Sequence, residues 1–330
     1  MSEEVTKFKV TIDGITAEVA PNITIVQAAR QIGGSAVPPT MCYYSKLENS
    51  GGRCRTCLVE VSKGSDKDPR PMPRLVPGCR TTVMDGMEVK VATSERVKQS
   101  VAGVTEFLLL NHPLDCPICD QAGECELQNL SYKHGTENTR TEFPRRTFKK
   151  EDIGKYISLN KNRCILCARC VLVANQLTNE RQHGILFRGD HAEISTYISK
   201  AIENDFSGNM IDVCPVGALT DRTARFKSRV WFTEPVNAHC NCGKCSGKVV
   251  LWLKGNEVIR VTARKDKYNE VEEFICNECR FERKDLKYWT IEGPAHISDH
   301  SVISLNHYEL PLPKDDPHYL INQQKTKMIE

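Results

Sequence analysis

Sixteen cysteines in a chain of 330 residues constrain this protein more than any other feature of its sequence. Their fraction is below that of short disulfide-stabilised scaffolds, and the first residues, MSEEVTKFKV, lack the basic-then-apolar pattern of a secretory signal. Disulfide bonds are therefore the weaker interpretation, and metal binding is the stronger one. The cysteines fall into four groups: Cys42, Cys54, Cys57 and Cys79; Cys116, Cys119 and Cys125; Cys164, Cys167, Cys170 and Cys214; and Cys240, Cys242, Cys245, Cys276 and Cys279.

The overall composition excludes several classes of protein. The 45 basic side chains nearly balance the 42 acidic ones, and a formal charge of +3 is far below that of a dedicated nucleic-acid binder. The length predicts about two domains, enough for more than one buried core. No stretch approaches the roughly 18 uninterrupted apolar residues of a membrane helix. We therefore expect a cytoplasmic protein that binds no nucleic acid and does not itself span a membrane.

The first cysteine group is expected in a loop of a small mixed sheet. Alternating apolar side chains over residues 8–19, with a turn at Asp13, predict a β-hairpin. A capping-box pattern that starts at Thr24 predicts a short helix, and further strands are predicted over residues 58–61 and 87–93. The loop between the helix and the next strand carries three of the four cysteines.

The spacing of this first group favours iron. Its pattern is Cys42-x11-Cys54-x2-Cys57-x21-Cys79, with Gly51 and Gly52 in the loop. Four thiolates hold two irons bridged by two sulfides, and glycines let backbone N–H groups approach the sulfurs. A zinc site is the alternative, although zinc usually takes two closely spaced pairs. The segment resembles the ferredoxin-like [2Fe-2S] domain of the complex I iron–sulfur subunit and of iron-only hydrogenases, apart from an insertion at residues 63–73.

The second group begins where a helix is expected to end. Helical periodicity runs through SERVKQSVAGVTEFLLLNH, and the motif HPLDCPICDQAGEC follows. A Cys3His zinc shell satisfies the same spacing. The motif nevertheless resembles the His(Cys)3 [4Fe-4S] domain of the same two families. A neutral imidazole in place of one thiolate is expected to raise the reduction potential. The four candidate ligands are His112, Cys116, Cys119 and Cys125.

The third group is close to the cysteine run of a bacterial ferredoxin. Cys164, Cys167 and Cys170 are each separated by two residues, and a distant Cys214-Pro215 completes a shell for a [4Fe-4S] cubane. One such repeat is present, so we expect all four cysteines to bind the same cluster. The segments RCILCARC and DVCPVGAL again resemble complex I.

The fourth group allows two ligand sets. The complex I subunit and the molybdopterin oxidoreductases have three spaced cysteines followed by a single one, whereas this chain has HCNCGKC and then two further cysteines. Because the flanking sequence resembles that family, a third [4Fe-4S] cluster is expected at the first of the two sets named below, with Cys279 as a substitute ligand. The second set has the spacing of a zinc ribbon. The first set is Cys240, Cys242, Cys245 and Cys276, and the second is Cys242, Cys245, Cys276 and Cys279.

From about residue 5 to residue 290 the chain resembles one family, the large electron-wiring iron–sulfur subunits (G subunits) of NADH-quinone oxidoreductase (complex I), in a short form without the C-terminal molybdopterin-type region. The resemblance implies an α+β fold: a β-grasp [2Fe-2S] domain, a helical His(Cys)3 segment, a ferredoxin-like [4Fe-4S] domain and a small β-rich cysteine domain. An extended tail follows, which is either flexible or wraps a partner subunit through its interspersed apolar and aromatic residues. The expected boundaries are residues 1–93, 94–135, 136–228, 229–290 and 291–330.

By this resemblance the chain is an electron relay on the cytoplasmic-side peripheral arm of an inner-membrane complex. Electrons from the FMN-bearing, NADH-oxidising subunit would pass through one [2Fe-2S] and two [4Fe-4S] clusters toward quinone, with that flavoprotein and other iron–sulfur subunits as partners. No dinucleotide-binding or hydrolytic motif is recognisable, so we expect no catalytic residue. Because the short form lacks the molybdopterin-type region, we expect no pterin. The alternative is an electron-transfer subunit of a soluble NAD-linked hydrogenase or formate dehydrogenase.

Overall fold

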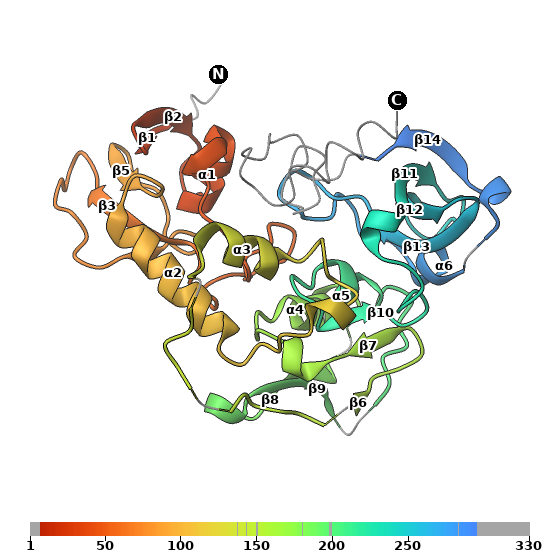
Figure 1. The fold of residues 1–330 in the computed structure, drawn as a ribbon. Helices are drawn as coiled ribbons and strands as arrows, with labels where there is room; N and C mark the ends of the chain where they lie inside the picture. Colours follow the sequence, from red (N-terminus) through yellow and green to blue (C-terminus); the bar gives the residue numbers. More distant parts are fainter. Residues whose placement is uncertain are drawn as a thin grey trace, which may run out of the picture.

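The computed structural model describes residues 7–136, 138–142, 144–149, 151–179, 181–197, 200–282 and 284–295. This part of the chain has an α+β fold, as predicted, in which four small sheets and several short helices follow one another (Figure 1). Residues 296–330, most of the predicted tail, lie outside the described residues. Within the described ranges, no helix is both long enough and apolar enough to cross a membrane.

The N-terminal sheet has the strand order β2-β1-β5-β3-β4 and packs against helix α1 (Figure 1). Strands β1 and β2 form the predicted hairpin, and β1 pairs in parallel with β5. Val10 and Val61 from the sheet share one buried core with Ala28 of the helix. The elements are β1 (Phe8–Ile12), β2 (Ile15–Val19), α1 (Ile25–Ile32), β3 (Leu58–Lys63), β4 (Val76–Pro77) and β5 (Met87–Lys90).

Local hydrogen bonds fix the ends of these elements. The capping box predicted at Thr24 is present at the start of α1. Strand β5 ends at Lys90, before the predicted end at residue 93. The reason is that the backbone N–H groups of Val91 and Ala92 donate to the carboxylate of Asp13, each at 2.8 Å, instead of continuing a strand ladder. The hairpin turn is thereby tied to the segment that leads into the next helix.

The described part of the middle of the chain forms four α-helices, a three-stranded sheet and a two-stranded sheet. Helices α2 (Glu95–Leu109) and α3 (Glu126–His134) pack against each other. After them come a three-stranded sheet of order β10-β7-β6, a two-stranded hairpin of β8 and β9, and two short helices. These elements are β6 (Glu151–Asp152), β7 (Ile157–Leu159), α4 (Arg169–Gln176), β8 (His183–Leu186), β9 (Glu193–Thr196), α5 (Asn209–Asp212) and β10 (Leu219–Asp221).

The C-terminal sheet has the order β13-β12-β11-β14, and helix α6 packs against β13 (Figure 1). Strand β14 crosses the boundary predicted at residue 290 because it pairs with β11 and extends this sheet to Pro294. The elements are β11 (Glu234–His239), β12 (Lys248–Lys254), β13 (Glu257–Ala263), α6 (Asn277–Phe281) and β14 (Thr290–Pro294). Short 3-10 turns are η1 (Gly34–Ala36), η2 (Cys116–Ile118), η3 (Lys161–Arg163), η4 (Gly189–His191), η6 (Val230–Phe232) and η7 (Leu286–Tyr288).

A buried ion pair joins the C-terminal sheet region to the middle of the molecule. Nη2 of Arg280, on α6, lies 2.5 Å from Oδ2 of Asp212, on α5, and the two side chains are 1% and 3% exposed. Beside this pair, the side chain of Asn209 donates to the carbonyl of Ile275 at 2.8 Å and accepts from its N–H at 3.1 Å. Because these buried groups pair across the two helices and the segment before α6, they fix the position of α6 relative to α5.

Replacing Asp212 with alanine leaves the buried Arg280 guanidinium without its carboxylate. We expect the Asp212→Ala protein to lose about 3–5 kcal/mol of stability. The matched control is Glu18→Ala, which breaks an exposed 3.9 Å pair with Lys7, and we expect it to cost about 0–1 kcal/mol. Thermal unfolding of the two variants side by side measures the difference, and equal melting temperatures would contradict this account.

Candidate metal centres

The four cysteines of the first group lie together in the loops around β3 of the N-terminal sheet. Cys42, Cys57 and Cys79 are buried and Cys54 is partly buried. The N–H of Gly52 donates to Sγ of Cys79 at 3.2 Å, and the N–H of Cys54 donates to Sγ of Cys42 at 3.4 Å. Backbone N–H groups therefore reach the sulfurs, as the glycines of this loop predict. Such hydrogen bonds stabilise thiolates and raise the potential of a bound cluster.

Glycine is required at position 51 of this loop. Gly51 has φ +97°, a left-handed conformation that other residues rarely adopt, and a Cβ there would stand 3.0 Å from Sγ of Cys79. The loop can therefore approach the sulfur closely only with hydrogen in place of a side chain.

The second group surrounds a cavity between the end of α2 and the start of α3. Its volume is about 760 Å³, and its lining includes His112, Cys116, Cys119 and Cys125. Nδ1 of His112 is buried and has no hydrogen-bond partner among the described residues. Burial lowers the pKa of His112, so its imidazole is neutral and can donate a lone pair to a metal. The unpaired nitrogen and the thiols around the cavity fit an iron–sulfur cluster.

The third group is built on a tight loop before α4, on the first turn of α4, which carries Cys170, and on the segment after α5. Leu166 and Ala168, between the first three cysteines, have φ of +55° and +64°, so two residues of this run take the left-handed conformation. The N–H of Leu166 donates to Sγ of Cys164 at 3.3 Å. Burial raises the pKa of the Cys164 thiol to about 12. Metal binding must therefore displace its proton, as it does at thiolate sites in general.

The second and third groups share one segment of chain. Cys214 belongs to the third group, and the carbonyl of the next residue, Pro215, accepts a hydrogen bond from the N–H of Glu126 at 3.1 Å and lies 3.8 Å from Sγ of Cys125. Gly217 then lies against the second group, since a Cβ on Gly217 would overlap Sγ of Cys119. The two groups are therefore direct neighbours in the fold.

One apolar cluster contacts ligands predicted for all three of these sites. Its buried members include Met41, Val216 and one candidate ligand of the second group, Cys125. Cys54 of the first group and Cys164 of the third pack against these residues. Cys214 of the third group packs there as well. The structure thus brings three sites that are distant in sequence into contact with a single water-poor core.

Arg169, which the sequence analysis did not single out, lies at the centre of this arrangement. Its guanidinium is buried and donates to the backbone carbonyls of Thr40 at 3.3 Å, Tyr43 at 3.0 Å and Val213 at 3.4 Å. It also pairs with Oε1 of Glu126 at 3.1 Å. An arginine directly before the last cysteine of the RCILCARC run was the available signal, but its partners are far away in the sequence.

Each partner of Arg169 lies close to a candidate ligand along the chain. Tyr43 follows Cys42, Glu126 follows Cys125, and Val213 precedes Cys214. Arg169 itself precedes Cys170. One positive charge therefore connects the loops of all three sites.

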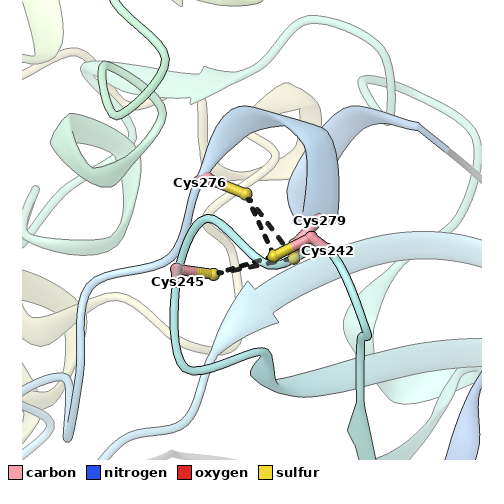
Figure 2. A group of neighbouring side chains, drawn as sticks. All are labelled: Cys242, Cys245, Cys276 and Cys279. Atoms are coloured by element: carbon pink, nitrogen blue, oxygen red, sulfur yellow. Dashed lines mark hydrogen bonds between the residues drawn. The ribbon is translucent and has the colours of Figure 1, made fainter.

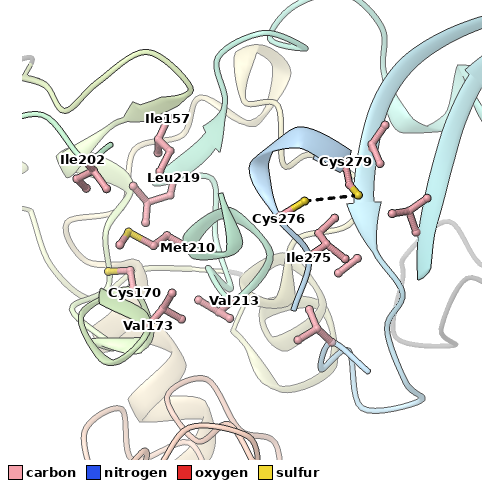
Figure 3. Close-up of a cluster of buried hydrophobic side chains, with 14 of the residues drawn as sticks. Ile157, Cys170, Val173, Ile202, Met210, Val213, Leu219, Ile275, Cys276 and Cys279 are labelled. Carbon is pink, nitrogen blue, oxygen red and sulfur yellow. Dashed lines mark hydrogen bonds between the residues drawn. The ribbon is translucent and has the colours of Figure 1, made fainter. Parts of the chain in front are cut away.

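In the fourth group, the structure brings together the thiols of the second predicted set (Figure 2). The sulfurs of Cys242, Cys245, Cys276 and Cys279 all lie within 4.8 Å of one another. Cys240 does not belong to this set, although it is buried beside it. The group shares a core with the third site, and Figure 3 shows Met210 and Val213 between Cys170 and the Cys276–Cys279 pair.

Comparisons with known proteins agree with these groups. The sequence matches three family models: a 2Fe-2S iron–sulfur cluster binding domain over residues 5–94, the NADH-ubiquinone oxidoreductase-G iron–sulfur binding region over residues 102–140, and the NADH-quinone oxidoreductase subunit 3 ferredoxin-like domain over residues 154–220. These regions contain the first three groups. The fourth group lies beyond them.

Several curated relatives cover most of this chain. The G subunit of NADH-quinone oxidoreductase from Rickettsia bellii is 37% identical over 90% of this chain and 42% of its own length. The NADH-ubiquinone oxidoreductase 75 kDa subunit of Reclinomonas americana is 38% identical over 86% of this chain and 39% of its own length. The chain thus spans about two fifths of the length of these relatives.

A solved structure shares the fold. A chain of an NAD+-reducing [NiFe]-hydrogenase in the H2-reduced state superposes with a TM-score of 0.58 at 24% identity, covering 68% of this chain and 91% of that one. Together, the fold, the grouped thiols and the matched domains define an iron–sulfur protein with separate [2Fe-2S]-binding and [4Fe-4S]-binding regions. More specifically, the chain belongs to the family of the G subunits of NADH-quinone oxidoreductase, which confirms the resemblance seen in its motifs.

A methyl group at position 217 tests the close contact between the second and third groups. In Gly217→Ala the new Cβ collides with Sγ of Cys119, so we expect the purified protein to lose the iron and acid-labile sulfide of one cluster. Gly103→Ala is the matched control, because a Cβ there meets nothing within 4 Å, and it should retain full iron. Equal iron contents in the two variants would show that Gly217 does not limit the second site.

Proposed function

We propose that this chain relays electrons within an NADH-quinone oxidoreductase, from a flavin-bearing, NADH-oxidising subunit toward quinone. The observation that carries the proposal is the apolar cluster that contacts candidate ligands of three sites at once. Centres packed around one core are suited to passing electrons among themselves. The family membership supplies the reaction that such a relay would serve.

The ligand assignment follows the groups described above. The first site would hold the [2Fe-2S] cluster, and the second and third would each hold a [4Fe-4S] cluster. The respective ligands are Cys42, Cys54, Cys57 and Cys79; His112, Cys116, Cys119 and Cys125; and Cys164, Cys167, Cys170 and Cys214.

The chain's own residues would set the environment of these centres. When bound, iron–sulfur clusters supply one-electron carriers whose potentials depend on charge, hydrogen bonds to sulfur and solvent exposure. Gly52 and Leu166 donate backbone hydrogen bonds to sulfurs, while Met41 and Val216 exclude water between the sites. Arg169 places a positive charge among the three loops and favours the reduced, more negative states.

The second site is the one best placed to exchange electrons with a partner. Leu114 and Ile118, which lie between its ligands in the sequence, are 80% and 59% exposed. Large exposed apolar side chains beside a cluster site are typical of an interaction surface. This apolar rim supports contact with another iron–sulfur subunit, within a peripheral arm on the cytoplasmic side of the membrane.

Purification of the tagged chain from its native cells tests the proposed complex. Co-purification with a flavoprotein and membrane subunits supports the NADH-quinone oxidoreductase. A hydrogenase or molybdenum subunit in their place would support the alternative, an electron-transfer subunit of a soluble hydrogenase or formate dehydrogenase. The chain of the NAD+-reducing [NiFe]-hydrogenase, which shares this fold, fits that alternative. A colourless protein without iron or acid-labile sulfide would refute both.

Exchanging the imidazole of the second site for a thiolate tests its ligation. His112→Cys adds a negative charge to the shell, so we expect the cluster to remain and its reduction potential to fall. A redox titration followed by electron paramagnetic resonance measures the shift. His191→Ala, at an exposed histidine, should leave the potential unchanged. An unchanged or higher potential in His112→Cys would count against His112 as a ligand.

Removing the central positive charge tests the role of Arg169. We expect Arg169→Gln to lower the cluster potentials by tens of millivolts, because about 1.4 kcal/mol of lost interaction equals about 59 mV for one electron. Arg169→Lys keeps the charge and should restore most of the shift. The exposed Arg188→Gln serves as control. If potentials in Arg169→Gln matched those of the control, Arg169 would have a structural role alone.

A further inference from the structure

We propose that Cys242, Cys245, Cys276 and Cys279 bind a single Zn²⁺ ion, and that this site is a structural cross-link outside the electron path. The proposal goes beyond the relay function, because it assigns the fourth group a different metal chemistry from the other three.

The distances between the sulfurs carry the assignment (Figure 2). Sγ of Cys242 lies 3.6 Å from that of Cys245 and 3.7 Å from that of Cys276. Sγ of Cys279 lies 3.7 Å from that of Cys245 and 3.6 Å from that of Cys276. With Zn–S bonds of about 2.3 Å, the edge of a tetrahedron of sulfurs around one ion is about 3.8 Å. The observed distances match that edge.

A cubane cannot be bound by sulfurs this close together. In a [4Fe-4S] cluster each thiolate binds a different iron at a different corner, so the four sulfurs lie farther apart than around a single ion. The other groups provide an internal comparison. Among the described residues, the fourth group is the one set of three or more cysteine, histidine or acidic ligand atoms that all lie within 4.8 Å of one another. The twelve candidate ligands of the first three sites are all described and do not converge in this way.

The local backbone prepares the first thiol pair for one ion. The N–H of Lys244 donates to Sγ of Cys242, and the N–H of Gly247 donates to Sγ of Cys245, each at 3.4 Å. Gly243 and Gly247 both have φ of +71°, which turns the chain back on itself around the sulfurs. A Cβ on Gly247 would overlap the carbonyl oxygen of Cys240. This turn therefore needs glycine, and it directs both sulfurs to one point.

The second thiol pair is anchored by α6. Cys276 is the N-cap residue of this helix, and Cys279 lies in its first turn. Both residues are fully buried. The buried Arg280–Asp212 pair fixes the same helix to α5, so this pair of thiols is held in place independently of any metal.

The fifth cysteine is positioned beside the site. Cys240 continues the ladder of β11, since its N–H donates to the carbonyl of Gly247 at 2.9 Å. Nζ of Lys284 lies 4.0 Å from Sγ of Cys240 and pairs with Glu278 at 3.3 Å. Four thiolates around Zn²⁺ leave a net negative charge, and this nearby lysine compensates part of it.

Zinc is the ion whose chemistry fits a closed shell of four thiolates from two Cys-x2-Cys pairs. It has no accessible one-electron couple, so it stabilises the fold and carries no current. The site joins the turn between β11 and β12 to the start of α6, two segments that are distant in the sequence. Binding would release the thiol protons and lock the two segments together.

The test uses the full chain purified anaerobically from cells supplied with both iron and zinc. Metal analysis should give one zinc per chain in addition to the iron of the relay clusters. Zinc X-ray absorption should show four sulfur neighbours at about 2.3 Å and no metal–metal scattering. This spectrum is decisive for the unmodified protein, even if a variant fails to fold.

Two cysteine variants locate the ion. Cys279→Ala should lose the zinc while retaining full iron and acid-labile sulfide, and the matched Cys240→Ala should keep both metals. Zinc retained in Cys279→Ala but lost in Cys240→Ala would overturn the ligand set. Iron in this site, either as a third cubane or as a single ion, would overturn the metal. Loss of all iron with zinc retained would instead contradict the relay and leave the zinc site standing.

Discussion

A buried guanidinium holds three candidate cluster sites against one another. Burying a charge is costly unless it is paired and hydrogen-bonded, and Arg169 meets this condition with one carboxylate and three backbone carbonyls. The carbonyls belong to loops that also carry candidate ligands, so the same bonds that satisfy the arginine set the relative positions of the sites. The apolar cluster around Met41 and Val216 then fills the space between them. Without the guanidinium, three loops with few regular elements would have little to fix their mutual geometry.

A second buried pair of an arginine and a carboxylate lies where the C-terminal sheet region meets the middle of the molecule. Arg280 and Asp212 form a buried pair that places α6 beside α5. Here the ion pair positions a tetrathiolate group at the far side of α5 from Cys170 (Figure 3). One short helix therefore separates two arrangements of thiols among the described residues. On one side are thiols that do not converge, and on the other are four that converge on one point.

Spacing along the chain predicted much of this organisation. The hairpin, the capping box at Thr24, the helix before His112 and the grouping of cysteines all depend on local patterns, and local patterns are readable from sequence. The choice between Cys240 and Cys279 could not be read from local patterns, because it depends on where β11 stops. Cys240 follows the last residue of β11 and extends its ladder by one hydrogen bond, and its thiol contacts those of Cys242 and Cys279. The turn that follows directs Cys242 and Cys245 toward α6. Arg169 was missed because each of its partners is distant in the sequence.

The stretch from Cys214 to Gly217 serves two centres within four consecutive residues, one through a thiol and the other through a carbonyl and a missing side chain. Neither centre can mature on a correctly folded scaffold while this stretch is displaced. A displacement of these four residues would therefore alter the surroundings of both candidate sites, even where only one of them loses its metal.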